Sequence, residues 1–309
     1  MKELYPMRGV ITTVNTPFNE DLTINWSDLR RTAEAALEAG VSGFLAPCFA
    51  SEIDELTNEE RYRMVTELLA VTHQAGHGIV MPNVRGKTKE DCVEQAKRYL
   101  DLGVDGVNIF MPTVTEESYR ELVAAVDELH PPFLCLQDTK DNELRAPFVK
   151  SMFEEFESFR CIKIETANPG PDYTAILKAT DGRLNVSGSW GSDQMIEAFD
   201  RGIHALMPSG LFELFVNVYR LYHEKSREAA MKLFFDILPI IVFTRQSDSA
   251  NLSLHKRYFQ RLGLYTTTKF RAPFAVDAVQ AHYIEEMIDR ALYIRDHMDQ
   301  YWQLSLIHI

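Results

Sequence analysis

The sequence predicts a (β/α)8 TIM barrel, an α/β fold, with a C-terminal three-helix extension. Two observations support this prediction. First, eight short apolar runs of strand length alternate with segments of helical periodicity. Second, one joint recurs at Gly40, Gly103 and Gly202, where a glycine ends a helix and a buried strand follows at once. Eight such units favour a closed parallel barrel over an open doubly wound sheet, which usually has about five or six strands.

The expected strands follow one another along the chain, and helices fill the intervals. Capping residues with acidic neighbours mark helix starts at Thr57 and Thr115. The eight apolar runs are residues 10–14, 43–47, 78–81, 106–111, 132–136, 159–164, 184–187 and 205–207. With the helix that follows the last run, we expect the barrel to occupy residues 1–223.

The C-terminal part continues with three amphipathic segments, residues 225–246, 252–262 and 277–297. No Gly/Ser-rich linker precedes them, so we expect residues 224–303 to form an extension of the same domain. Back-translation of residues 304–309 reproduces the end of a common sequencing adapter. We therefore expect this hexapeptide to be an artefact and assign it no function.

Composition and charge exclude several classes of protein. The chain has 45 acidic and 32 basic side chains, a net charge of −13, and no cluster of Lys or Arg, so nucleic acid and anionic membranes are poor partners. The apolar stretch 234–243 is interrupted by Asp236 and Pro239 and is too short to cross a bilayer, which takes about 20 residues. With no readable signal peptide, the expected location is the cytoplasm.

The cysteines and histidines give no sign of a metal or a cofactor. Cys48, Cys92, Cys135 and Cys161 lie far apart, and no two histidines have the spacing of a metal site. We expect reduced, mostly buried thiols, no metal and no cofactor.

Lys163 is the most unusual residue of the predicted strands. It lies in the apolar run 159–164, and a parallel barrel offers no solvated edge for a charged side chain. Reactive side chains of such barrels come from the C-terminal ends of strands. Because burial raises the neutral, nucleophilic fraction of an amine, Schiff-base chemistry with a carbonyl substrate suits this lysine.

Glu165 leaves two interpretations open. With period two along a strand, Glu165 shares a face with Lys163. It is the only nearby titratable side chain that could serve as an acid or base beside the amine. Alternatively, Glu165 neutralises Lys163, or a loop arginine such as Arg85, in a purely structural ion pair.

Several segments resemble the dihydrodipicolinate synthase / N-acetylneuraminate lyase family. They stand in the family's order at residues 8–11, 16–18, 40–44, 51–52, 56–61, 161–164 and 186–188. The resemblance implies a (β/α)8 barrel with C-terminal helices, class I aldolase or lyase activity on pyruvate-like 2-oxo acids, and a homo-oligomer, tetrameric or dimeric. It also implies that Lys163 is the Schiff-base lysine.

The chain departs from the family pattern around the expected substrate. The family's Gly-Thr-Thr-Gly-Glu loop, whose threonines hold the pyruvate carboxylate, reads Cys-Phe-Ala-Ser-Glu at residues 48–52. The family's proton-relaying tyrosine is Gln137 here, and a glutamine does not titrate. The candidate site therefore consists of the catalytic residues Lys163, Gln137 and Glu165 and the substrate-binding residues Phe49, Ala50, Ser51, Thr113, Gly188 and Met207.

Two functions follow from these residues. The first is a Schiff-base-forming lyase, aldolase or dehydratase that acts on a pyruvate-like 2-oxo acid or a 2-keto-3-deoxy sugar acid. The second is a non-catalytic ligand-binding barrel that kept the fold but lost the proton relay. Sequence does not name the acid, because pocket shape decides it.

Overall fold

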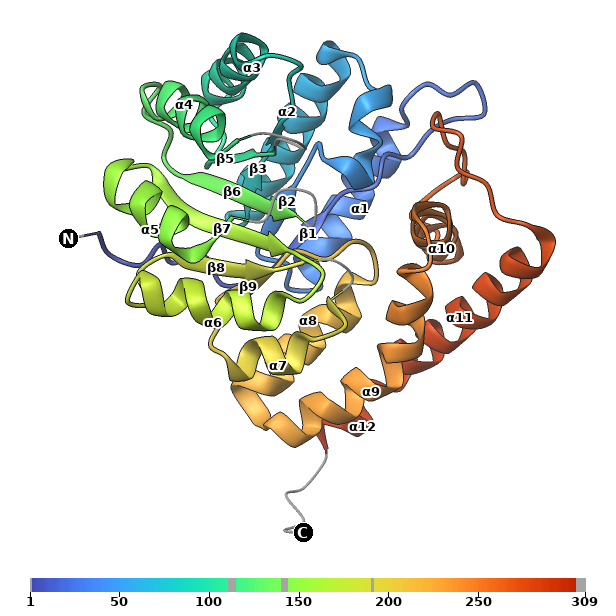
Figure 1. Cartoon of the computed structure of the whole chain (residues 1–309). Helices are drawn as coiled ribbons and strands as arrows, with labels where there is room; N and C mark the ends of the chain where they lie inside the picture. The colour runs from blue at the N-terminus through green and yellow to red at the C-terminus, as the bar shows by residue number, and fades with distance from the viewer. Residues whose placement is uncertain (1, 111–114, 140–143, 190–191, 304–309) are drawn as a thin grey trace.

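The computed structural model is a closed parallel barrel with helices around it (Figure 1), which confirms the predicted fold class. The structure describes residues 2–110, 115–139, 144–189 and 192–303. The strands pair in the order β3-β2-β1-β9-β8-β7-β6-β5-β4. Residues 304–309, where the adapter artefact is predicted, lie outside the described residues. The boundary at residue 224 stays a prediction.

The nine strands of the described residues occupy eight positions around the barrel, because β3 and β4 are two halves of one extended segment. Only Pro82 separates them, and β3 pairs with β2 while β4 pairs with β5. The Asn108 amide donates to the Pro82 carbonyl at 2.9 Å, so the barrel closes across the break. The strands are β1 Gly9–Thr13, β2 Gly43–Leu45, β3 Ile79–Met81, β4 Asn83–Val84, β5 Val107–Ile109, β6 Leu134–Thr139, β7 Phe159–Glu165, β8 Asn185–Gly188 and β9 Ala205–Leu206.

Helices follow the strands as predicted, and their starts carry the expected caps. Thr57 and Glu60 form a reciprocal capping box at the start of α2, and the Thr115 side chain caps α4. The helices around the barrel are α1 Trp26–Glu38, α2 Asn58–Ala75, α3 Lys89–Asp101, α4 Glu116–Asp127, α5 Ala146–Glu155, α6 Pro169–Ala179, α7 Met195–Asp200 and α8 Phe212–Arg220.

Strand boundaries differ from the prediction mainly in β6. This strand runs on to Thr139, three residues beyond the apolar run, so Gln137 lies inside the strand rather than in the loop after it. The apolar pattern stops at Leu136 because the next residue, Gln137, is polar and joins the hydrogen bonds inside the barrel mouth. β-Pairing with β7 continues through these polar residues.

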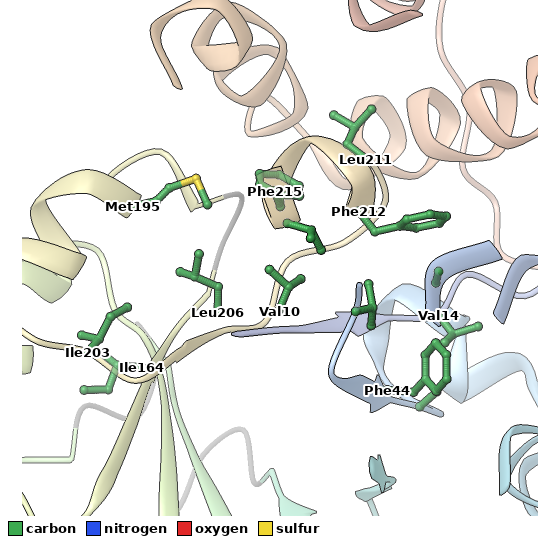
Figure 2. Packing of buried hydrophobic residues seen from close by; sticks show 14 of the residues in the cluster. Val10, Val14, Phe44, Ile164, Met195, Ile203, Leu206, Leu211, Phe212 and Phe215 are labelled. Atoms are coloured by element: carbon green, nitrogen blue, oxygen red, sulfur yellow. The ribbon is translucent and has the colours of Figure 1, made fainter. Parts of the chain in front are cut away.

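The apolar core has two layers. One fills the barrel interior and contains Ile11, Leu45, Met81 and Met207. The other lies between the strands and the helices. Figure 2 shows it where Val10 and Leu206 of the strands meet Phe212 and Phe215 of α8. Because both faces of every strand are covered, a polar side chain inside the barrel must find its partners there.

The three predicted C-terminal helices are present as α9 Arg227–Thr244, α10 Asp248–Arg261 and α11 Ala278–Asp296, followed by the short α12 Asp299–Trp302. In Figure 1, α10 lies on the side toward which the strand arrows point. Tyr265, which follows α10, donates from its hydroxyl to the Asn15 carbonyl at 2.5 Å. The extension therefore contacts the carboxyl ends of the strands. None of the described helices is both long and apolar enough to span a bilayer.

A fully buried ion pair ties the loop after β2 to α10. Lys256 Nζ lies 2.6 Å from Glu52 Oε1, and neither side chain is exposed. The backbone amides of Arg271 and Ala272 donate to Glu52 Oε2, each at 2.9 Å. Burial lowers the pKa of Lys256 to about 8, and the charge of Glu52 opposes that shift.

Two buried histidines are held neutral by their surroundings. His204 Nδ1 accepts a hydrogen bond from the Val186 amide at 2.9 Å, so this nitrogen carries no proton. Burial, together with the charge of Arg8, lowers the pKa of His204 to about 4. Burial alone lowers the pKa of His255 to about 3.

These histidines should make the fold sensitive to mild acid. Their pKa values lie below the unfolded value of 6.5, so the unfolded chain takes up protons first and stability falls as the pH drops from about 6.5 toward 4. Each should cost about 2 kcal/mol of unfolding free energy between about pH 7.5 and pH 5. Urea unfolding at both pH values measures this loss. His204→Gln should remove the part of this loss of unfolding free energy that comes from His204. The control His282→Gln, at a side chain that is 79% exposed, should leave the loss unchanged. An equal effect of the two substitutions would contradict the prediction.

Candidate active site

The candidate catalytic residues lie side by side at the carboxyl ends of neighbouring strands. The parallel register places Gln137 of β6 opposite Lys163 of β7, and Lys163 opposite Ser187 of β8. Lys163 is only 4% exposed. A strand in a closed barrel thus holds this amine against the interior, as its apolar neighbours in the sequence predicted.

Glu165 is the direct neighbour of the Lys163 amine. The distance from Lys163 Nζ to Glu165 Oε2 is 3.4 Å. Glu165 Oε2 also accepts a hydrogen bond from Gln137 Nε2 at 2.5 Å, and Oε1 accepts one from the Ser189 hydroxyl at 2.9 Å. Both oxygens of Glu165 therefore accept a hydrogen bond, and these two bonds fix the orientation of the carboxyl group beside the amine.

Two asparagines extend this network around the barrel. Asn108 Nδ2 on β5 donates to Gln137 Oε1 at 2.8 Å and also donates to Asn83 Oδ1 on β4. With its oxygen engaged in this way, Gln137 must turn its Nε2 toward Glu165. A hydrogen-bonded chain thus runs from Asn83 across the four strands β4 to β7 to Ser189, the residue after β8, and fixes the orientation of Gln137 and Glu165.

Sequence reasoning did not find Asn108. The signal was present, because Asn108 is a polar residue inside the apolar run 106–111, as Lys163 is inside its own run. A search for polar side chains inside the predicted strands would have found Asn108. It would also have found Gln137 if the predicted strand 132–136 had been extended to residue 139.

The loop after β2 forms the neighbouring part of the site. Residues Phe49–Ser51 form the short 3-10 helix η1. The Ser51 hydroxyl donates to the Val14 carbonyl at 2.5 Å and accepts from the Cys48 amide at 3.1 Å, so it serves the loop itself. Ala50 is buried, and its carbonyl accepts from Asn15 Nδ2 at 3.1 Å. Within η1 the Ser51 amide donates to the Cys48 carbonyl at 2.9 Å, whereas the first amides of a helical turn have no backbone carbonyl of that turn to bind.

The other candidate substrate-binding residues occupy different surroundings. Phe49 is 45% exposed and packs edge-on against Phe274. Met207 is buried in the barrel interior, and its carbonyl accepts from the Ser189 hydroxyl at 3.2 Å. A Cβ on Gly188 would meet the Tyr173 hydroxyl at 2.8 Å, so this position faces the helix layer. Thr113 lies outside the described residues.

Three of the four cysteines lie in the barrel interior with these residues. Cys48, Cys135 and Cys161 are all buried in the inner core. Burial raises the pKa of the Cys48 thiol, and the nearby charge of Lys163 opposes this effect. The loop after β2 and Lys163 are therefore neighbours in space. Within the described part of the chain, no group of three or more His, Cys, Asp or Glu is placed to hold a metal ion.

This arrangement suits imine chemistry. It offers an amine in a dry environment, a carboxylate within reach of that amine, and donors that keep the carboxylate oriented. Carbonyl addition needs such an amine as the nucleophile. The proton transfers that follow need an acid or base at the same place.

Comparisons with known proteins agree with this architecture. Residues 6–129 match the model of the Dihydrodipicolinate synthetase family. An uncharacterized DapA-like lyase of Halobacterium salinarum is 26% identical over 237 residues, covering 72% of this chain and 75% of the relative. An L-2-keto-3-deoxyarabonate dehydratase of Azospirillum brasilense is 24% identical over 197 residues, covering 61% of this chain and 62% of the relative.

The fold itself matches solved structures over almost the whole chain. The crystal structure of a dihydrodipicolinate synthase from Rhodopseudomonas palustris superposes with a TM-score of 0.85 at 20% identity, covering 94% of this chain and 100% of that chain. At this identity the likeness concerns the fold alone. Together the matches confirm the family resemblance found in the sequence, and the low identities mark this chain as divergent.

Proposed function

We propose that this chain, a divergent member of the dihydrodipicolinate synthase family, is a Schiff-base-forming lyase that acts on a 2-keto-3-deoxy sugar acid or a related 2-oxo acid. The observation that carries the proposal is the buried Lys163 amine, which lies 3.4 Å from a carboxylate whose two oxygens both accept hydrogen bonds. The family match and the curated relatives named as lyases support it.

The reaction begins when the neutral Lys163 amine adds to the 2-oxo carbon of the substrate. The carbonyl oxygen takes one proton from the amine and one from solvent and leaves as water, so that a protonated imine joins Nζ to that carbon. The imine withdraws electrons from the adjacent carbon, so no cofactor is needed. A proton can then leave that carbon, or the bond to the next carbon can break.

Glu165 takes the proton-transfer role that the family gives to a tyrosine. An ionised carboxylate beside the imine accepts the proton from the substrate and returns it to the leaving hydroxyl or to the product carbon. Gln137 does not titrate, so it orients Glu165 and the substrate through hydrogen bonds. In this proposal Glu165 transfers the proton and Gln137 only positions groups, so the site works without the family's tyrosine.

The polar groups around Lys163 and one relative support the proposed substrate class. The Azospirillum relative is named for a 2-keto-3-deoxy sugar acid. In this chain, the amides of η1, including those of Phe49 and Ala50, replace the family's threonine hydroxyls as donors to the substrate carboxylate. We expect the Ser189 hydroxyl and the backbone at Gly188 and Met207 to contact a polyhydroxy tail. The substrate-binding role of Thr113, which lies outside the described residues, stays a prediction.

The assembly and location proposed for this chain are those of a cytoplasmic homo-oligomer, a dimer or a tetramer. The family resemblance supports the oligomer, and the acidic net charge of −13 is in keeping with a protein that avoids nucleic acid and anionic membranes.

The competing function is a non-catalytic barrel in which Glu165 only neutralises Lys163. The ion pair between Lys163 and Glu165 would be present in that case as well. A non-catalytic barrel, however, gives no role to the chain of side-chain hydrogen bonds from Asn83 to Ser189, because these bonds set the orientation of Glu165 rather than its charge.

Reductive trapping separates the two functions. Borohydride added in the presence of pyruvate, 2-oxobutyrate or 2-keto-3-deoxy sugar acids should fix the imine, and peptide mass spectrometry should find the added mass on Lys163. Lys163→Met is the control that removes the amine. Binding of one of these acids without any mass on Lys163 would favour the non-catalytic barrel, and mass on another lysine would contradict the site assignment.

A further inference from the structure

A pocket lies at the opposite end of the barrel from Lys163. It has a volume of 340 Å³ and is formed where the chain enters β1, where α1 joins β2, and along the end of α8. Its polar lining comes from Arg8, Ser42, Tyr219, Arg220 and Glu224. Arg8 directly precedes β1, at the amino end of the strands, whereas Lys163 lies toward the carboxyl end of β7. The pocket shares no lining residue with the candidate active site.

Arg8 brings an uncompensated positive charge to this pocket. Its side chain is exposed, and no salt bridge joins it to any acidic group among the residues that the structure describes. The charge of Arg8 acts on its neighbours: burial lowers the pKa of His204 and of His223, and the Arg8 charge adds to this effect. In an acidic chain with a net charge of −13, a cation that no carboxylate neutralises marks a place for an anion.

Arg220 supplies a second guanidinium, which forms an exposed ion pair with Glu224. Arg220 Nε lies 3.1 Å from Glu224 Oε1, and Arg220 Nη2 lies 3.0 Å from Glu224 Oε2. Both side chains are about half exposed, and exposed pairs of this kind are weak, so an incoming dianion can compete for Arg220.

The backbone beside Arg220 departs from regular helix. Leu221–Lys225 forms a π-helical turn, in which the Ser226 amide donates to the Leu221 carbonyl at 2.8 Å. Such turns are rare and frequently occur at functional sites. The lining of the pocket also requires a glycine at position 9. Gly9 has a φ of +89°, and a Cβ there would lie 2.3 Å from Ser42 Oγ. Only glycine leaves the Ser42 hydroxyl free beside the chain.

We propose that this pocket binds the phosphoryl group of a small molecule. Arg8 and Arg220 bind it as charged donors, and the hydroxyls of Ser42 and Tyr219 donate from the side of the barrel. A tetrahedral phosphoryl group presents three acceptor oxygens in different directions, which suits donors that converge from β1, β2 and α8. The volume of 340 Å³ is that of a small-ligand pocket.

Calorimetric titration with inorganic pyrophosphate, at low ionic strength and neutral pH, tests the proposal. Pyrophosphate should bind the wild-type chain, and Arg8→Gln should weaken binding by at least about tenfold, because a charge-assisted pair is lost. Glu224→Gln should tighten binding severalfold, because it removes a like charge and frees Arg220. Arg30→Gln is the matched control: it removes an exposed guanidinium from α1, outside the pocket, and should leave binding unchanged.

Four results would overturn the proposal. They are no pyrophosphate binding at millimolar concentration, wild-type affinity in Arg8→Gln, an equal loss in Arg30→Gln, and tighter binding of the carboxylate probe citrate than of pyrophosphate. Lys163→Met should bind pyrophosphate like the wild type. Failure of this proposal is thus distinguishable from failure of the proposed lyase activity.

Discussion

Replacing Glu165 with glutamine should lower kcat by about 10²–10⁴-fold while the chain still forms its imine. The amide keeps the size of the carboxylate and can still bond to Gln137 and Ser189, but it cannot accept a proton from the substrate. Addition of the Lys163 amine needs no proton from Glu165 once the amine is neutral. Steady-state turnover of the best trapped acid, compared with the borohydride-trapped fraction, measures the two effects separately.

The controls for this prediction lie in the same network. Lys163→Met should lose both the imine and turnover. Ser189→Ala removes one donor to Glu165 but leaves the carboxylate, so its kcat should fall far less than that of Glu165→Gln. Equal losses in both Glu165→Gln and Ser189→Ala, or an undiminished kcat in Glu165→Gln, would show that Glu165 does not transfer the proton.

Replacing Lys256 with methionine should lower the free energy of unfolding by about 3–5 kcal/mol, because the substitution leaves the Glu52 carboxylate buried without its cation. The side chains are similar in length, so the effect is mainly electrostatic. The double variant Lys256→Met with Glu52→Gln should recover most of the loss. Urea unfolding of the three chains at neutral pH gives the comparison.

An exposed pair provides the reference for that experiment. Arg30 and Glu67 lie 2.7 Å apart, but Arg30 is 48% exposed, so Arg30→Met should cost less than about 1 kcal/mol. A cost for Lys256→Met no larger than that of Arg30→Met would mean that the buried pair contributes no more than a surface pair.

The sequence predicted the barrel because its signals are local. The glycine that ends a helix at Gly40, Gly103 and Gly202, and the apolar run that follows it, are visible within about ten residues. Packing between strand and helix only completes these units. Lys163 was found for the same reason, since a charged residue inside an apolar strand is itself a local anomaly. Pro82, by contrast, hides the continuity of β3 and β4, because a proline reads as a strand end.

The parts that escaped prediction depend on contacts between distant residues. The bond from Asn108 to Gln137 needs the register between β5 and β6, which no local pattern specifies. Lys256 looks like any solvated lysine of an amphipathic helix. Only the fold reveals that it lies against Phe18, Phe270 and Glu52, in a place that water does not reach.

The contact between Glu52 and Lys256 also has a consequence for biosynthesis. The two residues are separated by 204 positions in the chain. At about 5–20 residues per second, a ribosome needs roughly 10–40 s to make the residues that separate them. During that interval the nascent chain can already pair its first strands, but the carboxylate of Glu52 has no cation to bind. The loop that carries Phe49–Ser51 therefore reaches its final structure among the last parts of the protein. A chain released before Lys256 is made would have its first strands paired but the loop after β2 incomplete.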